Sequence, residues 1–166
     1  MKWVLIGTGV FVVLIVIVVA IGMALPVKHT VSRSASFAVP PESLWRAITT
    51  IPELPTWRKN LQKVEVLPDR NGHPVWRETD NDGSAITFEM IEAVPPKMLV
   101  TRIADTDLAF GGSWTYEINP SGTGSEITIT ENGEVYNPIF KFVSRFIIGH
   151  YGSIDDYLEG LKKVVR

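Results

Sequence analysis

Two glutamates have the settings in this sequence that best suit acid–base chemistry. Glu131 continues the alternation of Ile127 and Ile129, so a strand there would turn its carboxylate toward the apolar face of a sheet. Glu78 is placed in the same way, two residues after Trp76. Because burial disfavours the charged form, one of two interior carboxylates would hold a raised pKa and could donate or accept a proton.

A structural role is the competing interpretation for either glutamate, and the sequence leaves both open. In that role the carboxylate is solvated at a strand end or forms an ion pair with Arg58 or Arg102. Structural ion pairs also perturb carboxylates, so a shifted pKa alone would not identify a catalytic group. We therefore assign no catalytic residue from the sequence.

Several aromatic and methionine side chains are expected to face inward beside these glutamates. They are Trp57, Trp76, Met90, Trp114, Tyr116, Phe142 and Phe146. Such residues usually serve core packing, but they also line apolar cavities that contain a few polar groups. Together with Glu78 and Glu131 they are our candidate ligand-binding residues.

Other chemistries have little support. The chain has no cysteine, which excludes disulfides and thiol catalysis. His29, His73 and His150 lack ligand spacing, so we expect neither a metal nor a cofactor. His150 and Ser153 share one face of a predicted helix, which by itself is weak evidence for a nucleophile. The net charge of −2, without a basic stripe, argues against a nucleic-acid partner.

The elements that must position these residues alternate between short helices and strands. A strand is expected within 27–39, and Pro40-Pro41-Glu42 begins a short helix. A broken helix occupies 51–61, because Pro52 and Pro55 interrupt it. About six strands follow as a meander, since apolar residues alternate between turn signals.

The apolar spacing in the C-terminal region predicts one long amphipathic helix. Asn137-Pro138 supplies its N-cap and first residue, and Gly149 and Gly152 are positions where it would bend. An antiparallel sheet with one apolar face needs a cover, and this helix is long enough to supply it. The sequence therefore predicts an α+β fold in which a long C-terminal helix covers the apolar face of an antiparallel sheet.

An uncharged apolar run from Trp3 to Leu25 precedes this domain. As a helix it would be roughly 34 Å long, enough to cross a hydrocarbon core of about 30 Å. A cleaved signal peptide is the alternative, with Gly22-Met23-Ala24 as the cleavage region, but the run exceeds the usual signal core. A dinucleotide fingerprint beginning at Ile6-Gly7-Thr8-Gly9 is rejected because its third glycine would fall on Val12.

The predicted organisation is a membrane anchor at 1–25 and one domain at 26–166. Lys2 lies before the span, whereas Lys28 and Arg33 lie after it. The excess of one positive charge weakly favours a cytoplasmic C-terminal domain and leaves the orientation open. The expected location is a membrane crossed once.

The soluble part resembles a known superfamily in the order and spacing of several short motifs. These are Pro40-Pro41-Glu42-Ser43-Leu44-Trp45, Ile51-Pro52-Glu53-Leu54-Pro55-Thr56-Trp57, Trp76-Arg77-Glu78, Phe110-Gly111-Gly112-Ser113-Trp114, Ile129-Thr130-Glu131-Asn132-Gly133 and Tyr136-Asn137-Pro138-Ile139. They resemble the START-like, Bet v 1-type (SRPBCC) superfamily and, within it, bacterial polyketide cyclase/dehydrase-type proteins. The resemblance implies a helix-grip fold with an apolar cavity for a lipid, quinone, sterol-like or polyketide molecule, and a bacterial inner membrane as the site of the anchor.

Three functions fit this pattern. The favoured one is a membrane-anchored module that binds a hydrophobic small molecule. The second is a cyclase/dehydrase-type enzyme that uses Glu131 or Glu78 as acid or base. The third is a structural protein that the helix places at a membrane. An interior filled by side chains favours the third function, whereas an open cavity favours the first two.

Overall fold

A computed structural model describes residues 2–165 as one long helix followed by an α+β domain. The helices are α1 (Lys2–Ala24), α2 (Pro41–Thr49), η1 (Ile51–Thr56), α3 (Pro138–Val143), η2 (Ser144–Ile148) and α4 (Gly152–Val164). The strands are β1 (Lys28–Phe37), β2 (Leu61–Arg70), β3 (His73–Asp80), β4 (Ala85–Val94), β5 (Met98–Ile103), β6 (Phe110–Ser121) and β7 (Gly124–Val135).

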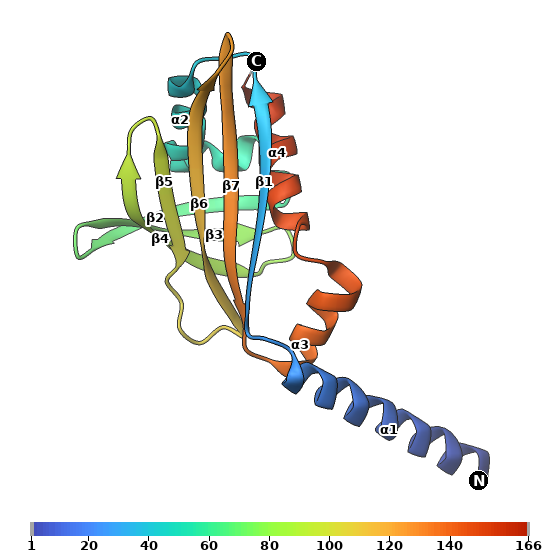
Figure 1. Ribbon diagram of the computed structural model, residues 1–166. Coiled ribbons are helices and arrows are strands. Elements are labelled where there is room, and N and C mark those ends of the chain that lie inside the picture. Colours follow the sequence, from blue (N-terminus) through green and yellow to red (C-terminus); the bar gives the residue numbers. More distant parts are fainter. Residues whose placement is uncertain (1, 166) are drawn as a thin grey trace.

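The strands form one seven-stranded antiparallel sheet in the order β1-β7-β6-β5-β4-β3-β2. Strands β2 to β7 are a meander, joined by turns such as Asn71-Gly72, where both residues have positive φ. This is the backbone shape that two-residue hairpins favour. β1 pairs with β7, so the first and last strands lie side by side (Figure 1). The predicted helix-grip fold is confirmed.

The core lies between the sheet and two helices. Leu44 and Ile48 of α2 and Leu161 of α4 are buried there, against Ile118 of β6 and Ile127 of β7. These apolar positions recur at helical spacing on the helices and at every second residue on the strands. The alternation that predicted the strands therefore also set which face is buried.

The terminal helical region is divided, where the sequence predicted one bent helix. α3 and η2 end at Gly149, whose φ of +79° is in the left-handed region, and α4 begins at Gly152. The expectation that Phe146 faces inward is wrong, because its side chain is 60% exposed. Phe142 is half-buried and packs against Phe146, with ring centroids 5.0 Å apart. The break turns these residues away from the stripe that α4 buries.

Helix α1 points away from the domain, and the C-terminal end of this helix contacts the domain (Figure 1). Gly22 is buried against Pro138 of α3, so closely that a Cβ would overlap the Pro138 carbonyl. Lys141 donates from Nζ to the carbonyl oxygen of Leu25 at 3.0 Å. By length and composition, α1 could cross a membrane.

Candidate functional site

A cavity of about 440 Å³ lies between the sheet and the helices. This volume is within the range of small-molecule sites. Its wall is mainly apolar and comes from α2, η1, strands β1 and β3 to β7 and the segment from α3 to α4. The interior is therefore open, which argues against a purely structural role.

An aromatic row forms one part of this wall. Trp76 of β3 lies opposite Phe88 of β4 in the register, and the two rings stack with centroids 5.8 Å apart. Trp114 of β6 meets Phe88 edge to face at 5.9 Å. Offset stacking and edge-to-face contact are the geometries that aromatic pairs prefer. The row fixes both indoles within the cavity wall.

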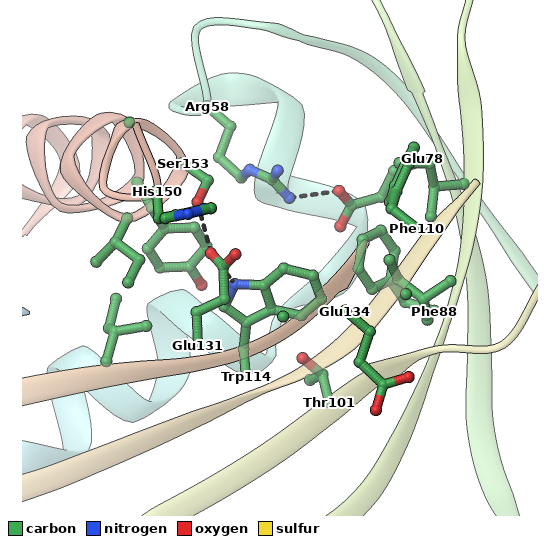
Figure 2. Close-up of a pocket in the computed structure, with 18 of the residues that line it drawn as sticks. Arg58, Glu78, Phe88, Thr101, Phe110, Trp114, Glu131, Glu134, His150 and Ser153 are labelled. Carbon is green, nitrogen blue, oxygen red and sulfur yellow. Dashed lines mark hydrogen bonds and ion pairs between the residues drawn. The ribbon is translucent and has the colours of Figure 1, made fainter. Parts of the chain in front are cut away.

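Each of the two indoles donates its N–H to a cavity glutamate. Trp76 donates to Oε1 of Glu78 at 2.9 Å, and Trp114 donates to Oε2 of Glu131 at 3.0 Å. Both carboxylates are buried, at 6% and 9% exposure. Each is the centre of a polar cluster, and Figure 2 shows the two clusters facing the same cavity.

The Glu78 cluster contains an ion pair. Arg58, which follows η1, donates from its guanidinium to Oε2 of Glu78 (Figure 2). The guanidinium also lies 5.5 Å from the ring centroid of Tyr157. Both carboxylate oxygens of Glu78 thus have donors, as the paired interpretation of this residue expects. The pair supplies the charge compensation that a buried carboxylate needs.

Two tyrosines beside this cluster stay protonated at neutral pH. Tyr116 and Tyr157 contact each other, with ring centroids 5.4 Å apart. Burial raises the pKa of Tyr116 to about 12, although Arg58 acts against it. Burial also raises the pKa of Tyr157 well above its ordinary value. Both phenols line the cavity as neutral hydrogen-bonding groups.

The Glu131 cluster joins three strands and a helix. Oε2 also accepts from Ser153 Oγ at 2.7 Å, and His29 Nε2 lies 3.3 Å from Oε1. His29 stacks on His150 with ring centroids 3.9 Å apart. Ser153 is in the first turn of α4, where the helix dipole favours a negative charge. The Trp114 indole, the Ser153 hydroxyl and the His29 imidazole thus surround the Glu131 carboxylate at the cavity wall.

The strand register explains how this cluster assembles. Trp114 lies directly opposite Glu131, and His29 lies opposite Gly133, two residues further on the same face of β7. A side chain at position 133 would overlap the His29 ring, so Gly133 leaves the space that this ring fills. No local sequence pattern placed His29 beside Glu131, because the strand that pairs with β1 is distant along the chain.

The histidine pair also sets the local electrostatics. Burial lowers the pKa of His150. The nearby His29 and Arg145 lower this pKa further, whereas Glu131 raises it. Ser153 donates to Glu131 and not to His150, which lies before α4, so these two residues do not form a nucleophile and base. Within residues 2–165, no group of three or more histidine or acidic side chains is arranged to hold a metal ion.

Only some of the predicted ligand-binding residues lie together at the cavity. Those that line the cavity are Trp76, Glu78, Trp114, Tyr116 and Glu131. Trp57 instead packs edge to face on Tyr157 in the core, and half-buried Met90 packs against the same core. Helical spacing predicted burial for Trp57 and alternation predicted it for Met90, but neither pattern could separate the core from the cavity wall.

The cavity also contains residues that the sequence did not single out as ligand contacts. Phe88, Phe110 and Thr101 come from the sheet, and Phe140 and Ile148 come from α3 and η2. Phe88 alternates with Ile86 and Met90, which is a signal that could have placed it beside Trp76. The α3 and η2 residues could not be found in this way, because their position depends on the break at Gly149.

Comparison with known proteins identifies the family of this chain. The family model described as "Polyketide cyclase / dehydrase and lipid transport" matches residues 28–166. The chain belongs to this family. The match covers the whole α+β domain and begins after α1. A search of curated proteins finds no match.

Solved structures with the same fold include plant and bacterial proteins. Truncated norcoclaurine synthase from Thalictrum flavum aligns with a TM-score of 0.67 at 16% identity, over 84% of this chain and 94% of that one. The di-domain ARO/CYC StfQ from the steffimycin biosynthetic pathway aligns with a TM-score of 0.65 at 8% identity, over 84% and 50% of the two chains. Protein MLL2253 from Mesorhizobium loti gives 0.62 at 21% identity, over 82% and 96%. At these identities the likeness shows the fold alone.

Proposed function

We propose that this family member binds a hydrophobic small molecule, of lipid, quinone or polyketide-like type, in the cavity of its α+β domain. The supporting observation is the open interior of about 440 Å³, with mainly apolar walls and the two polar clusters around Glu78 and Glu131. Apolar walls supply binding free energy, while a few fixed polar groups orient the ligand. A family described by cyclase, dehydrase and lipid transport activities is consistent with such a ligand.

We further propose that residues 1–25 are a retained anchor and that 26–166 are the ligand-binding domain of a single-pass membrane protein. Gly22 and Leu25 both contact α3, as a permanent part of the structure would. A signal peptide removed after Ala24 would lose the Gly22 contact. The intact mass of the mature protein tests this point, because cleavage would remove α1 from it.

Native mass spectrometry of the full chain, released from detergent micelles, tests the binding proposal. We expect an apolar molecule to co-purify and to be lost from Thr101→Trp, which fills the cavity from β5. Thr123→Trp, in the exposed β6–β7 turn, is the matched control and should retain the molecule. Equal loading of the two variants, or an empty wild-type protein, would contradict the proposal.

An enzyme of the cyclase/dehydrase type is the second candidate, and Glu131 is the observation that favours it. Its carboxylate lines the cavity beside His29, whose imidazole could exchange a proton with it. Glu78 is less suited, because Arg58 and Trp76 occupy both of its oxygens as a closed ion-pair cluster. In this function Glu131→Gln abolishes turnover of a poly-β-keto thioester while loading by the co-purified molecule persists. Undiminished turnover by Glu131→Gln would exclude Glu131 as the acid or base.

A further inference from the structure

The segment from Pro138 to Ile148, comprising α3 and η2, carries an unusual density of exposed apolar side chains. Ile139, Phe140, Phe146, Ile147 and Ile148 are between 47% and 70% exposed. Outside α1, no other stretch of residues 2–165 has so many large exposed apolar side chains close together. A contiguous patch of this kind marks an interaction surface.

The contacts with α1 place this segment at a defined height. A hydrocarbon core takes about 20 helical residues, so a span that begins at Trp3 ends near Gly22. Gly22 is the residue of α1 that lies against Pro138, and Leu25 is bound by Lys141. If α1 spans a bilayer, the segment therefore lies at the boundary between acyl chains and headgroups.

The composition of the segment fits that boundary. Its only charged residues are Lys141, which is buried and bound to the Leu25 carbonyl, and Arg145, which is exposed. Exposed Ile and Phe side chains suit the acyl side of a membrane interface, and anionic headgroups attract a basic side chain such as Arg145. The occupant of the patch is accordingly a lipid bilayer.

The same segment closes one end of the cavity. Phe140, Ser144 and Ile148 line the interior, so a single layer of chain separates the cavity from the exposed patch. Its last turn is wide, with the amide of Gly149 donating to the carbonyl of Ser144 at 3.0 Å. Turns of this width often occur at functional sites. The segment is followed by Gly149, whose positive φ is a conformation that glycine adopts more readily than other residues.

We infer that residues 138–148 lie in the bilayer interface beside α1 and form the passage by which the apolar ligand moves between the bilayer and the cavity. This inference rests on the proposed anchoring of α1. In this arrangement α1 has a second role, because its contacts with α3 hold residues 138–148 against the lipid. A ligand taking this route never crosses water.

Depth-dependent fluorescence quenching tests the position of the segment. The chain has no cysteine, so single cysteines can carry a label on the full chain in vesicles of phosphatidylcholine and phosphatidylglycerol. We expect brominated lipid to quench a label at Ile147→Cys, although less than one at Val13→Cys in the middle of α1. A label at Thr123→Cys, in the distant β6–β7 turn, should remain unquenched (Figure 1).

The outcomes separate the inference from the proposal beneath it. Quenching at Val13→Cys without quenching at Ile147→Cys would overturn the interface position and leave the anchor intact. A lack of quenching at Val13→Cys would overturn both. The label at position 147 replaces an exposed side chain, so it should not disturb packing.

A transfer measurement tests the passage itself. The probe is N-phenyl-1-naphthylamine supplied in the same vesicles, detected by energy transfer from the tryptophans of the α+β domain in a Trp3→Phe background. We expect Ile147→Glu to slow the approach to equilibrium by about tenfold, which is about 1.4 kcal/mol on the barrier, and to leave the final amplitude unchanged. Thr123→Glu should change neither. An unchanged rate in Ile147→Glu would overturn the passage, and a lack of energy transfer in any variant would overturn the cavity proposal together with it.

Discussion

The ammonium group of Lys141 donates a hydrogen bond to the carbonyl oxygen of Leu25 at 3.0 Å, joining residues that are 116 positions apart. Leu25 directly follows α1, and the side chain of Lys141 is buried although the residue is charged. A cation at the C-terminal end of a helix satisfies a free carbonyl and is favoured by the helix dipole. This bond and the Gly22 contact fix the helix to the domain at two points.

Replacing Lys141 should loosen α1 from the domain. Lys141→Met leaves the Leu25 carbonyl without its donor, a loss of about 1–3 kcal/mol, or roughly 5- to 150-fold in the opening equilibrium. Tryptic cleavage after Lys28, followed by mass spectrometry of the full chain in detergent, should accelerate accordingly. Lys97→Met, at an exposed position, is the control and should leave cleavage unchanged. Equal cleavage of both variants would show that the bond does not hold the helix.

Two glycines in α4 should respond oppositely to alanine. A Cβ on Gly160 would lie 2.7 Å from the carbonyl oxygen of Trp57, so Gly160→Ala should displace α4 and lower the free energy of unfolding by about 1–3 kcal/mol. Gly152 has open space around it, and Gly152→Ala should be neutral or stabilise by about 0.4–1 kcal/mol. Urea unfolding followed by tryptophan fluorescence measures both, and a comparable loss at the two sites would contradict the packing shown here.

The hydrogen bond between Trp114 and Glu131 should appear as a coupling energy. A double-mutant cycle of Trp114→Phe and Glu131→Gln is expected to give about 1.5–3 kcal/mol, because the acceptor is a buried carboxylate. The exposed pair Ser34 and Thr128, whose hydroxyl oxygens are 2.8 Å apart, provides a control cycle and should give less than about 1 kcal/mol. Additive effects at Trp114 and Glu131 would argue against a fixed carboxylate in the cavity wall.

Stability should decrease as the pH falls through the titration of His150. Its folded pKa lies below the ordinary 6.5, chiefly through burial, with His29 and Arg145 acting in the same sense and Glu131 opposing. The unfolded chain then binds the proton more readily, so the stability present above about pH 6.5 is progressively lost below it. Urea unfolding from about pH 8 to about pH 5 should show this decline, and His150→Asn should flatten part of it. A profile identical in the variant would place the titration elsewhere.

Local patterns predicted most of the fold because they record which face of each element is apolar. The alternation of Ile127, Ile129 and Glu131 predicted a strand with its glutamate turned inward, and Glu131 does line the cavity. The motif beginning at Asn137-Pro138 predicted a helix start, and the Asn137 side chain accepts from the amides of Ile139 and Phe140. Such signals are local, so they can be read without knowing which segments meet.

The sequence by itself determined the order of the strands, the short helices that follow the first strand and the apolar segment that precedes the domain. Alternation also indicated an inward face for Glu131 and Glu78, but it left their role open. Only the tertiary structure decided that His29 lies beside Glu131, because alternation specifies a face but not the distant strand that pairs with it. The tertiary structure also decided that the helical stripe breaks at Gly149 and that Phe146 is exposed. The apolar spacing in the sequence continues past this glycine, whereas its positive φ ends the helix there.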